Sequence, residues 1–320
     1  MGKEDRNIWL DGVMGVIVGD ALGCPVQFKS RKEIVARGPV IGMEGHGTFD
    51  MPEGTWTDDG SMTLALLDSI RECVVIDLPD IMDRFCRWCW NGEYTPFGKA
   101  FDIGNATIRA ISKYGQTKDV TTCGGTSEHD NGNGSLMRIL PACLYCFEQN
   151  RRYDADDAEV VRLIHEVSGL THNHIRAKIG CGLYYFMVRG ILDSGLSLED
   201  RLQKGLDDGF AYYESDDATK TELSHYDRLR SLKTFSGLGE EAIKGSGYVV
   251  EALEAAVWCL VNTDSFKDCL LKVVNLGDDT DTVAAIAGGL AGLYYGYDAI
   301  PSEWLSVIQR REWIEEMCEM

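Results

Sequence analysis

The sequence has little positive charge. Its 320 residues include 31 Lys and Arg against 51 Asp and Glu, which gives a formal net charge of −20 at pH 7. A surface this acidic repels phosphate backbones and anionic lipid headgroups. We therefore expect neither nucleic acid nor a membrane as a partner of this protein.

Long apolar runs are also missing. The longest one, Val283 to Tyr297, is too short to span a bilayer. Near the N-terminus, Asp11 and Asp20 interrupt the apolar residues, so we expect no signal peptide. The seven prolines and 35 glycines follow no fixed period, which excludes collagen-like and linker-like sequences. The expected protein is soluble and cytoplasmic.

The cysteines lack the spacing of a disulfide framework. There are 11 of them, an odd number, and they are scattered along the chain. In a chain of this size, such cysteines indicate a reduced intracellular protein. Two CxxC pairs, Cys86/Cys89 and Cys143/Cys146, lie far apart and inside helical patterns, so we predict core residues rather than zinc ligands.

Helical periodicity dominates the chain. Between Ser61 and Val75, apolar side chains recur at steps of three and four, which places them on one face of a helix. Five further segments follow the same pattern: Ile81–Trp90, Val160–Val167, Ala177–Leu192, Tyr248–Val261 and Phe266–Val274. Alternation with period two is short and rare. The sequence therefore predicts one compact all-α domain.

Three segments have the composition of loops. They are Gly38–Gly60, Thr121–Gly134 and Glu214–Gly247, and each leads directly into another helical pattern. None has the length or composition of an interdomain linker. We expect them to be long functional loops of the single domain.

Two acidic clusters stand at the starts of apolar helices. One is Thr57–Ser61, with Asp58 and Asp59, and the other is Asp278–Thr282, with three aspartates. Asp and Thr are common helix N-caps, but one cap needs only one or two such residues. Oxygen ligands in this number are also what Mg²⁺, Mn²⁺ or Ca²⁺ binds. From the residue types alone, capping and metal binding both remain open.

Two further motifs could bind a ligand. Asn131–Arg138 is a run of small residues before an apolar helix, whose free N–H groups could hold a phosphate or diphosphate. It matches neither the dinucleotide fingerprint nor the P-loop, so an ordinary glycine-rich helix entry is the alternative. His172 lies at a helix start, where a capping or hydrogen-bonding role competes with a role as general base.

Taken together and in this order, the motifs resemble the ADP-ribosylglycohydrolase family, which includes the dinitrogenase-reductase-activating glycohydrolases. Six segments carry the resemblance. Gly15–Gly23 resembles the family's opening helix, Gly54–Asp59 its first metal motif and Gly132–Arg138 its central glycine loop. Thr171–His172 resembles the middle motif, and Gly245–Val249 and Asn275–Thr282 resemble the C-terminal pair. The resemblance covers nearly the whole chain.

The resemblance implies a fold, a cofactor and a reaction. The fold is an orthogonal all-α bundle formed by one domain over residues 1–320, with a cleft that holds two Mg²⁺ ions, or Mn²⁺. The implied substrate is an ADP-ribosylated protein, and the product is ADP-ribose released from a side chain, often arginine. The implied metal ligands are Thr57, Asp58, Asp59, Asp279, Asp281 and Thr282.

The resemblance also assigns roles in the reaction. A divalent cation lowers the pKa of a bound water, and a carboxylate such as Asp58 or Asp59 is expected to assist proton transfer. The glycine loop is expected to hold the diphosphate, and Tyr248 to lie near the ribose or adenine. The residues implied to bind the substrate are Gln27, Asn133, Gly134, Ser135, Leu136, Met137, His172, Gly247 and Tyr248.

Two positions depart from the family pattern. Many members carry an acid where this chain has Gln27, and an amide can orient a group but cannot act as a base. This difference affects the expected linkage specificity more than the metal site. At Asp278 the family usually carries glycine, and we expect this extra carboxylate to be solvated.

Three functions are compatible with these residues. The first is a metal-dependent hydrolase for ADP-ribosylarginine in proteins. The second is a catalytically weak protein that binds ADP-ribose. Gln27 would favour this function, whereas the two complete acidic motifs argue against it. The third is a hydrolase for another linkage, either O-linked to serine or in a small molecule.

Overall fold

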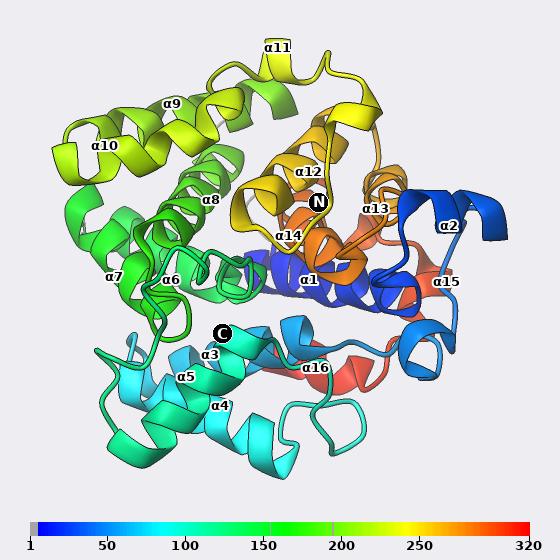
Figure 1. Cartoon of the computed structure of the whole chain (residues 1–320), viewed down its shortest axis with the longest axis horizontal. Helices are drawn as coiled ribbons and strands as arrows, with labels where there is room; N and C mark the ends of the chain where they lie inside the picture. Colours follow the sequence, from blue (N-terminus) through cyan, green and yellow to red (C-terminus); the bar gives the residue numbers. More distant parts are fainter. Residues whose placement is uncertain (1–5, 154, 194) are drawn as a thin grey trace.

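The computed structural model describes residues 6–153, 155–193 and 195–320. Over these ranges the chain forms α-helices, short 3-10 helices and isolated β-bridges, with no β-strand (Figure 1). The α-helices are α1 (Ile8–Gly23), α2 (Arg31–Arg37), α3 (Asp58–Cys73), α4 (Leu78–Asn91), α5 (Asn105–Thr117), α6 (Leu140–Tyr153), α7 (Asp157–Gly169), α8 (Ile175–Asp193), α9 (Leu198–Glu214), α10 (Asp217–Leu223), α11 (Leu232–Phe235), α12 (Val249–Val261), α13 (Phe266–Val274), α14 (Thr280–Tyr295), α15 (Ser302–Leu305) and α16 (Arg311–Met317). The all-α prediction is confirmed.

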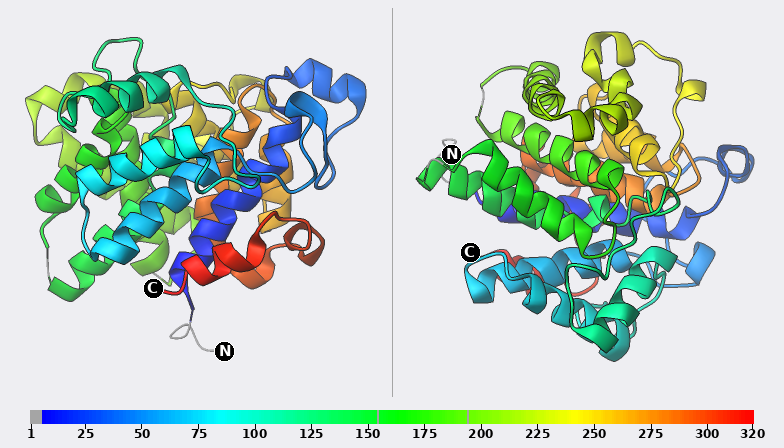
Figure 2. Two further views of the ribbon diagram at one scale, coloured as in Figure 1. Left: turned by 90° about the horizontal axis from the view of Figure 1, so that it is seen from below. Right: turned by 60° about the vertical axis from the view of Figure 1, so that its left-hand side comes forward.

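Two apolar helices from opposite ends of the chain form the centre of the molecule. α1 and α14 pack side by side, and both are buried at nearly every position. Helices that are apolar on all sides are typical of an enclosed core. α3 packs on α1, whereas α12 and α13 pack on α14. Figure 2 shows α1 between a layer formed by α3, α4 and α5 and a second layer that contains α8, α9 and α12.

α1 and the residues after it, through Val26, are long and apolar enough to cross a membrane by length and composition. However, 89% of this apolar window is buried inside the protein. The core helix of a globular protein passes the same test of composition. In this structure the segment is a core helix that other helices enclose.

The six helical segments predicted from periodicity are confirmed as α3, α4, α7, α8, α12 and α13. The prediction of a loop over Glu214–Gly247 is wrong, because the segment contains α10, α11 and the 3-10 helices η5 (Ser224–Arg230) and η6 (Glu240–Ala242). These elements are too short to produce a detectable period. Side-chain caps define them instead: Asp216 caps α10 and Ser231 caps α11.

The cysteines contribute to the interior. All 11 are free thiols, and most are buried. Cys86 and Cys89 lie within α4, and Cys143 and Cys146 lie within α6. Three of these four are buried and Cys89 is half-buried, which agrees with the predicted role in the core.

Candidate active site

α1 and α14 approach each other closely because their shared face carries glycines at four-residue spacing. A Cβ atom on Gly15 or Gly19 would overlap the backbone of α14, at Gly288 and Ala284 respectively. At Gly23, a Cβ would overlap the Cα and N atoms of Asp281. The distance between packed helices depends on the side chains at the contact, and these three positions of α1 carry none. The start of α14 therefore lies directly beside the end of α1.

Asp20 fixes the start of α3 against α1. Its carboxylate accepts hydrogen bonds from the backbone N–H of Thr57 (2.8 and 2.9 Å to its two oxygens) and of Gly60 (2.7 Å). Asp20 thus satisfies N–H groups at the beginning of α3 that have no partner within the helix. The aspartates of the first motif, Asp58 and Asp59, are not needed as caps.

The two acidic motifs meet in space. A carboxylate oxygen from each of Asp20, Asp59 and Asp281 lies within 4.8 Å of the other two. The hydroxyls of Thr57 and Thr282 both donate to Asp59 Oδ2, at 3.2 and 3.5 Å. Neither Thr57 nor Asp279, the N-cap residues of α3 and α14, makes a side-chain capping bond. Plain capping therefore does not account for these residues.

The chemistry of the cluster fits a divalent cation. Burial, together with neighbouring carboxylates, raises the pKa of Asp58, Asp59 and Asp281 well above the ordinary range. Among the described residues around this cluster, four buried acceptor oxygens have no hydrogen-bond donor: Gln27 Oε1, Asp59 Oδ1, Asp102 Oδ2 and Asp281 Oδ2. Buried carboxylates without partners are costly unless a cation compensates them. Hard oxygen ligands in this arrangement suit Mg²⁺, Mn²⁺ or Ca²⁺.

The cluster opens into a cavity of about 360 Å³. Its walls come from the turn after α1, the start of α5, the glycine loop and the start of α14. Eight residues predicted from the sequence line this cavity: Gln27, Asp58, Asn133, Gly134, Met137, His172, Asp279 and Thr282. Asn133 Nδ2 donates to Asp279 Oδ2 at 2.8 Å, which joins the glycine loop to the second acidic motif.

The remaining predicted residues lie beside the cavity or beneath it. The side chains of Ser135 and Leu136 are buried in the core, so only their backbone groups could face a ligand. Gly247 accepts a hydrogen bond from the N–H of Asn133 at 3.0 Å, and Tyr248 pairs with Gly132 through an isolated β-bridge. The segment Gly247–Tyr248 therefore supports the glycine loop from behind.

The glycine loop does not enter an α-helix directly, in contrast to our expectation. The 3-10 helix η4 (Leu136–Arg138) follows the loop, and α6 begins only at Leu140. Pro141 stands in the first turn of α6, where its missing N–H is tolerated. The N–H of Met137 bonds to Asn133 O at 3.0 Å and is not free for an anion.

Sequence reasoning missed three residues of the site. Asp20 lies within the opening motif, but its role as a cap for α3 depends on the tertiary structure. Asp102 lines the cavity, adopts φ +57° and is half-buried, and its charge raises the pKa of Asp58. Phe28 also lines the cavity, with φ +67° and 66% of its surface exposed. A single Asp or Phe in a loop carries no sequence signal that could have identified it.

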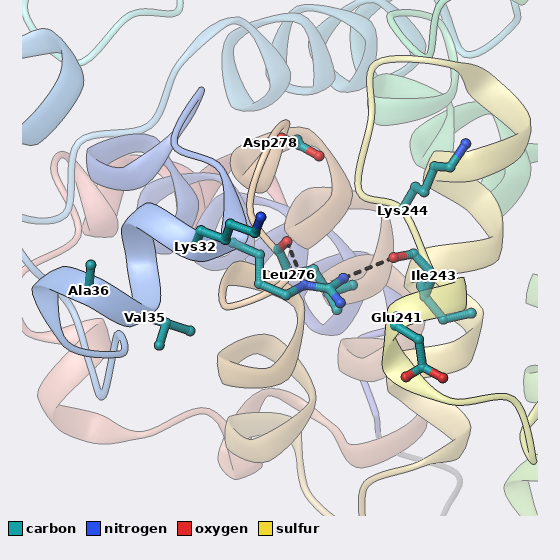
Figure 3. Close-up of a pocket in the computed structure, with 9 residues that line it drawn as sticks. Lys32, Val35, Ala36, Glu241, Ile243, Lys244, Leu276 and Asp278 are labelled. Atoms are coloured by element: carbon teal, nitrogen blue, oxygen red, sulfur yellow. Dashed lines mark hydrogen bonds between the residues drawn. The ribbon is translucent and has the colours of Figure 1, made fainter.

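A second cavity, of about 520 Å³, lies between α2 and the segment around Ile243 (Figure 3). None of the predicted site residues lines it. Arg31 donates to the carbonyl oxygens of Leu276 (3.1 Å), Glu240 (2.9 Å) and Ile243 (2.9 Å), and Figure 3 shows two of these bonds. Arg31 thereby ties α2 to the turn that precedes α14, which is a structural role.

Asp278 is exposed, as expected, and its carbonyl oxygen accepts the N–H of Phe28 at 2.7 Å. The backbone N–H of Asp278 in turn donates to Lys29 O at 2.8 Å. The turns that follow α1 and precede α14 are therefore hydrogen-bonded to each other. This pairing holds Phe28 in its left-handed backbone conformation at the mouth of the cavity.

An all-α fold in which two acidic helix starts meet beside a glycine loop defines the class of the protein. The family profile described as ADP-ribosylglycohydrolase matches residues 3–320. The chain therefore belongs to the ADP-ribosylglycohydrolase family.

Two relatives and one solved structure illustrate the similarity. The ADP-ribosylarginine hydrolase Tri1 of Serratia proteamaculans is 31% identical over 307 residues, which cover 96% of this chain and 76% of that protein. The ADP-ribosyl-[dinitrogen reductase] glycohydrolase of Rhodospirillum rubrum is 31% identical over 303 residues, which cover 94% of this chain and 90% of that protein. A solved structure described as an "ADP-ribosylglycohydrolase-related protein complex" superposes with a TM-score of 0.77 at 29% identity, and covers 99% of this chain and 97% of that one.

Proposed function

We propose that the protein is a metal-dependent hydrolase that removes ADP-ribose from arginine side chains of ADP-ribosylated proteins. The observation that carries this proposal is the meeting of two acidic motifs, with buried acceptor oxygens that lack donors, at the base of one cavity. The names of two relatives at 31% identity support the reaction, and the name ADP-ribosylarginine hydrolase of one of them supports the arginine linkage.

The proposed cofactor is a pair of Mg²⁺ ions, with Mn²⁺ as the alternative. Thr57, Asp58 and Asp59 would hold the ions from the start of α3, and Asp279, Asp281 and Thr282 from the start of α14. When bound, divalent cations lower the pKa of a coordinated water and stabilise developing negative charge. The glycine spacing of α1 and the bonds from Asp20 to α3 support this ligand set, because together they hold both helix starts beside the end of α1.

The two adjacent aspartates of the first motif would have different roles. Asp58 lines the cavity, whereas Asp59 is turned toward Thr57 and Thr282 and does not line it. We therefore assign proton transfer to Asp58, in addition to its place in the ligand set, and metal binding alone to Asp59. Asp102 lies on the same cavity wall beside Gln27, and its carboxylate would take over the base function that an amide cannot provide.

The mouth of the cavity favours a cationic leaving group. Phe28 presents an exposed ring there, and its edge-to-face contact with Phe49 (ring centroids 6.3 Å apart) orients it. An arginine guanidinium can stack on such a ring and is attracted by the nearby carboxylates. A serine linkage would gain neither interaction.

The proposal also covers the domain organisation of the protein and the compartment in which it works. The whole chain, residues 1–320, would act as a single ADP-ribosylglycohydrolase domain. It would work in the cytoplasm on protein substrates and not on nucleic acid or membranes, in keeping with 11 free thiols and a net charge of −20.

The test measures release of ADP-ribose from arginine-linked and serine-linked protein substrates, each with Mg²⁺, with Mn²⁺ and with a chelator. Metal-dependent release from the arginine substrate alone is the expected result. Phe28→Ala should raise KM for that substrate by about fivefold, because a cation–π contact of about 1 kcal/mol is lost, with kcat little changed. Phe28→Tyr, which keeps an aromatic ring, is the matched control.

Two results would contradict the proposal. Binding of ADP-ribose without release from either substrate would favour a protein that only binds ADP-ribose. Faster release from the serine substrate would reassign the linkage and remove the role given to Phe28.

A further inference from the structure

Arg138 is a buried cation without a carboxylate partner. It is fully buried, and in the described part of the chain it takes part in no ion pair. Its Nη2 donates to Thr171 Oγ1 at 2.9 Å and to Val167 O at 3.2 Å, whereas Nε and Nη1 have no acceptor. The guanidinium lies over the ring of Phe85 at 4.7 Å. Since burying an unpaired charge is costly, the position of Arg138 points to a functional role.

The hydrogen bonds fix the proton of the Thr171 hydroxyl. A guanidinium only donates, so Thr171 Oγ1 accepts from Arg138. The other side-chain partner of Thr171 is His172 Nδ1, at 2.9 Å. If Nδ1 carried a proton, both neighbours would donate to Oγ1, and the hydroxyl proton would have no acceptor in a fully buried place. Thr171 therefore donates to an unprotonated Nδ1.

This arrangement determines the tautomer of His172. A neutral imidazole carries one proton, and with Nδ1 as acceptor the proton is on Nε2. The charged groups that act on the ring are Arg138, Arg109 and Asp130. Burial, followed by the positive charge of Arg138, lowers the pKa of His172 to about 3, so the ring stays neutral at physiological pH.

Nε2 points toward the glycine loop. A Cβ on Gly134 would lie 3.1 Å from Nε2 and 2.7 Å from Cε1, so only glycine leaves room for the ring there. His172 lines the cavity, and no acceptor among the described residues bonds to Nε2. The backbone of His172 is fixed as well, through its N–H to Ser168 O (2.9 Å) and its bridge to Gly125.

We propose that Arg138 and Thr171 are positioning residues, which hold His172 as the neutral tautomer protonated on Nε2. In this state, His172 donates one hydrogen bond to an oxygen of the ADP-ribosyl group at the glycine loop. The identity of the ligand rests on the proposed function, whereas the position of the proton does not.

Nitrogen NMR of the whole protein labelled with ¹⁵N-histidine tests the position of the proton directly. One-bond and long-range couplings distinguish a protonated from an unprotonated ring nitrogen, and loss of the signals in His172→Asn assigns them. We expect Nε2 to be protonated and Nδ1 to be unprotonated from about pH 5.5 to 8, well above the pKa of His172. A proton on Nδ1, or an imidazolium in this range, would overturn the proposal.

Two pairs of variants test the function of the tautomer by calorimetry with ADP-ribose. Thr171→Val should weaken the binding of ADP-ribose about tenfold and produce a mixture of the two tautomers. Thr171→Ser keeps the hydroxyl, so it should have the affinity and the single tautomer of the wild type. His172→Gln carries an amide N–H near the position of Nε2 and should bind better than His172→Asn.

The outcomes separate this inference from the proposed function. If Thr171→Val binds as tightly as the wild type, or Thr171→Ser fails to restore the Nε2 proton, Arg138 and Thr171 do not position His172. If Thr171→Val fails to fold, Thr171→Ser and the two His172 variants still test whether Thr171 and His172 act as proposed. A wild-type protein with the expected tautomer but no affinity for ADP-ribose would contradict the proposed ligand and leave the assignment of the proton intact.

Discussion

Oxygen atoms without donors are the most informative residue-scale feature of the site. Asp59 and Asp281 come from opposite ends of the chain, yet each leaves one buried carboxylate oxygen unpartnered, and Gln27 leaves its amide oxygen unpartnered. Natural structures rarely leave such atoms without a donor, an ordered water or an ion. The convergence of several acceptors on one place therefore fits the proposed cation.

Asp281→Asn removes one of these buried charges. We expect the rate of ADP-ribose release to fall by about 100-fold or more, because the variant removes a proposed metal ligand. Without added metal, the same variant should be more stable than the wild type by about 1 kcal/mol, since it relieves repulsion among buried carboxylates. Turnover assays and thermal unfolding in the presence of a chelator measure the two effects.

Asp278→Asn is the matched control for this prediction. Asp278 lies in the turn that precedes α14 and is exposed, and asparagine tolerates its φ of +65°. Both the rate and the stability should stay close to those of the wild type. Full activity of Asp281→Asn, or equal losses in the two variants, would contradict the ligand assignment.

At the scale of helices, the contact between α1 and α14 builds the site. Gly15, Gly19 and Gly23 let the two backbones touch, and Thr280 Oγ1 donates to Gly23 O at 2.8 Å at the end of this contact. The acidic motif at the start of α14 depends for its position on residues more than two hundred positions earlier in the chain. A change in α1 should therefore act on the chemistry without removing any functional group.

Gly23→Ala tests this dependence. The added methyl would overlap the backbone of Asp281, which no rotamer change can relieve. We expect a loss of about 1–3 kcal/mol in the free energy of unfolding and a larger relative loss of metal affinity. Denaturant unfolding and metal titration measure the two quantities. Gly237→Ala, in an exposed turn where the Cβ would meet only Thr234 O at 3.6 Å, should change neither.

Sequence patterns predicted the helices and many of the residues that the structure brings together at the candidate site, but not how the parts are held together. Long amphipathic segments such as Phe266–Val274 follow from periodicity, and the acidic motifs were visible as charge at helix starts. Asp102 and Phe28 were missed because a residue in a loop becomes part of a site only through the fold. The cap on α3 was missed because Asp20 reaches it from another helix.

At the scale of the whole molecule, the buried acids couple stability to pH and to metal. Without metal, burial raises the pKa of Asp20 to about 7, and burial with neighbouring charges raises the pKa of Asp58 and Asp59 well above the ordinary range. An unfolded Asp releases its proton near pH 4. Between about pH 4 and 7 the folded state therefore binds more protons, and the free energy of unfolding decreases as the pH rises.

We expect the melting temperature of the chelated protein to fall between about pH 5 and 7.5. Saturating Mg²⁺ should restore it at the upper pH and have little effect at the lower one, because protons and metal compete for the same oxygens. Differential scanning calorimetry measures both. A melting temperature that Mg²⁺ leaves unchanged at the upper pH would contradict the coupling.

The most direct test of the central claim counts metal ions and turnover in the same samples. Chelated protein is titrated with Mn²⁺, free Mn²⁺ is followed by its electron paramagnetic resonance signal, and release of ADP-ribose from an arginine-linked substrate is measured at each step. We expect two ions to bind per chain and activity to appear only as they bind. Full release from metal-free protein, or turnover that does not depend on the bound ions, would contradict it.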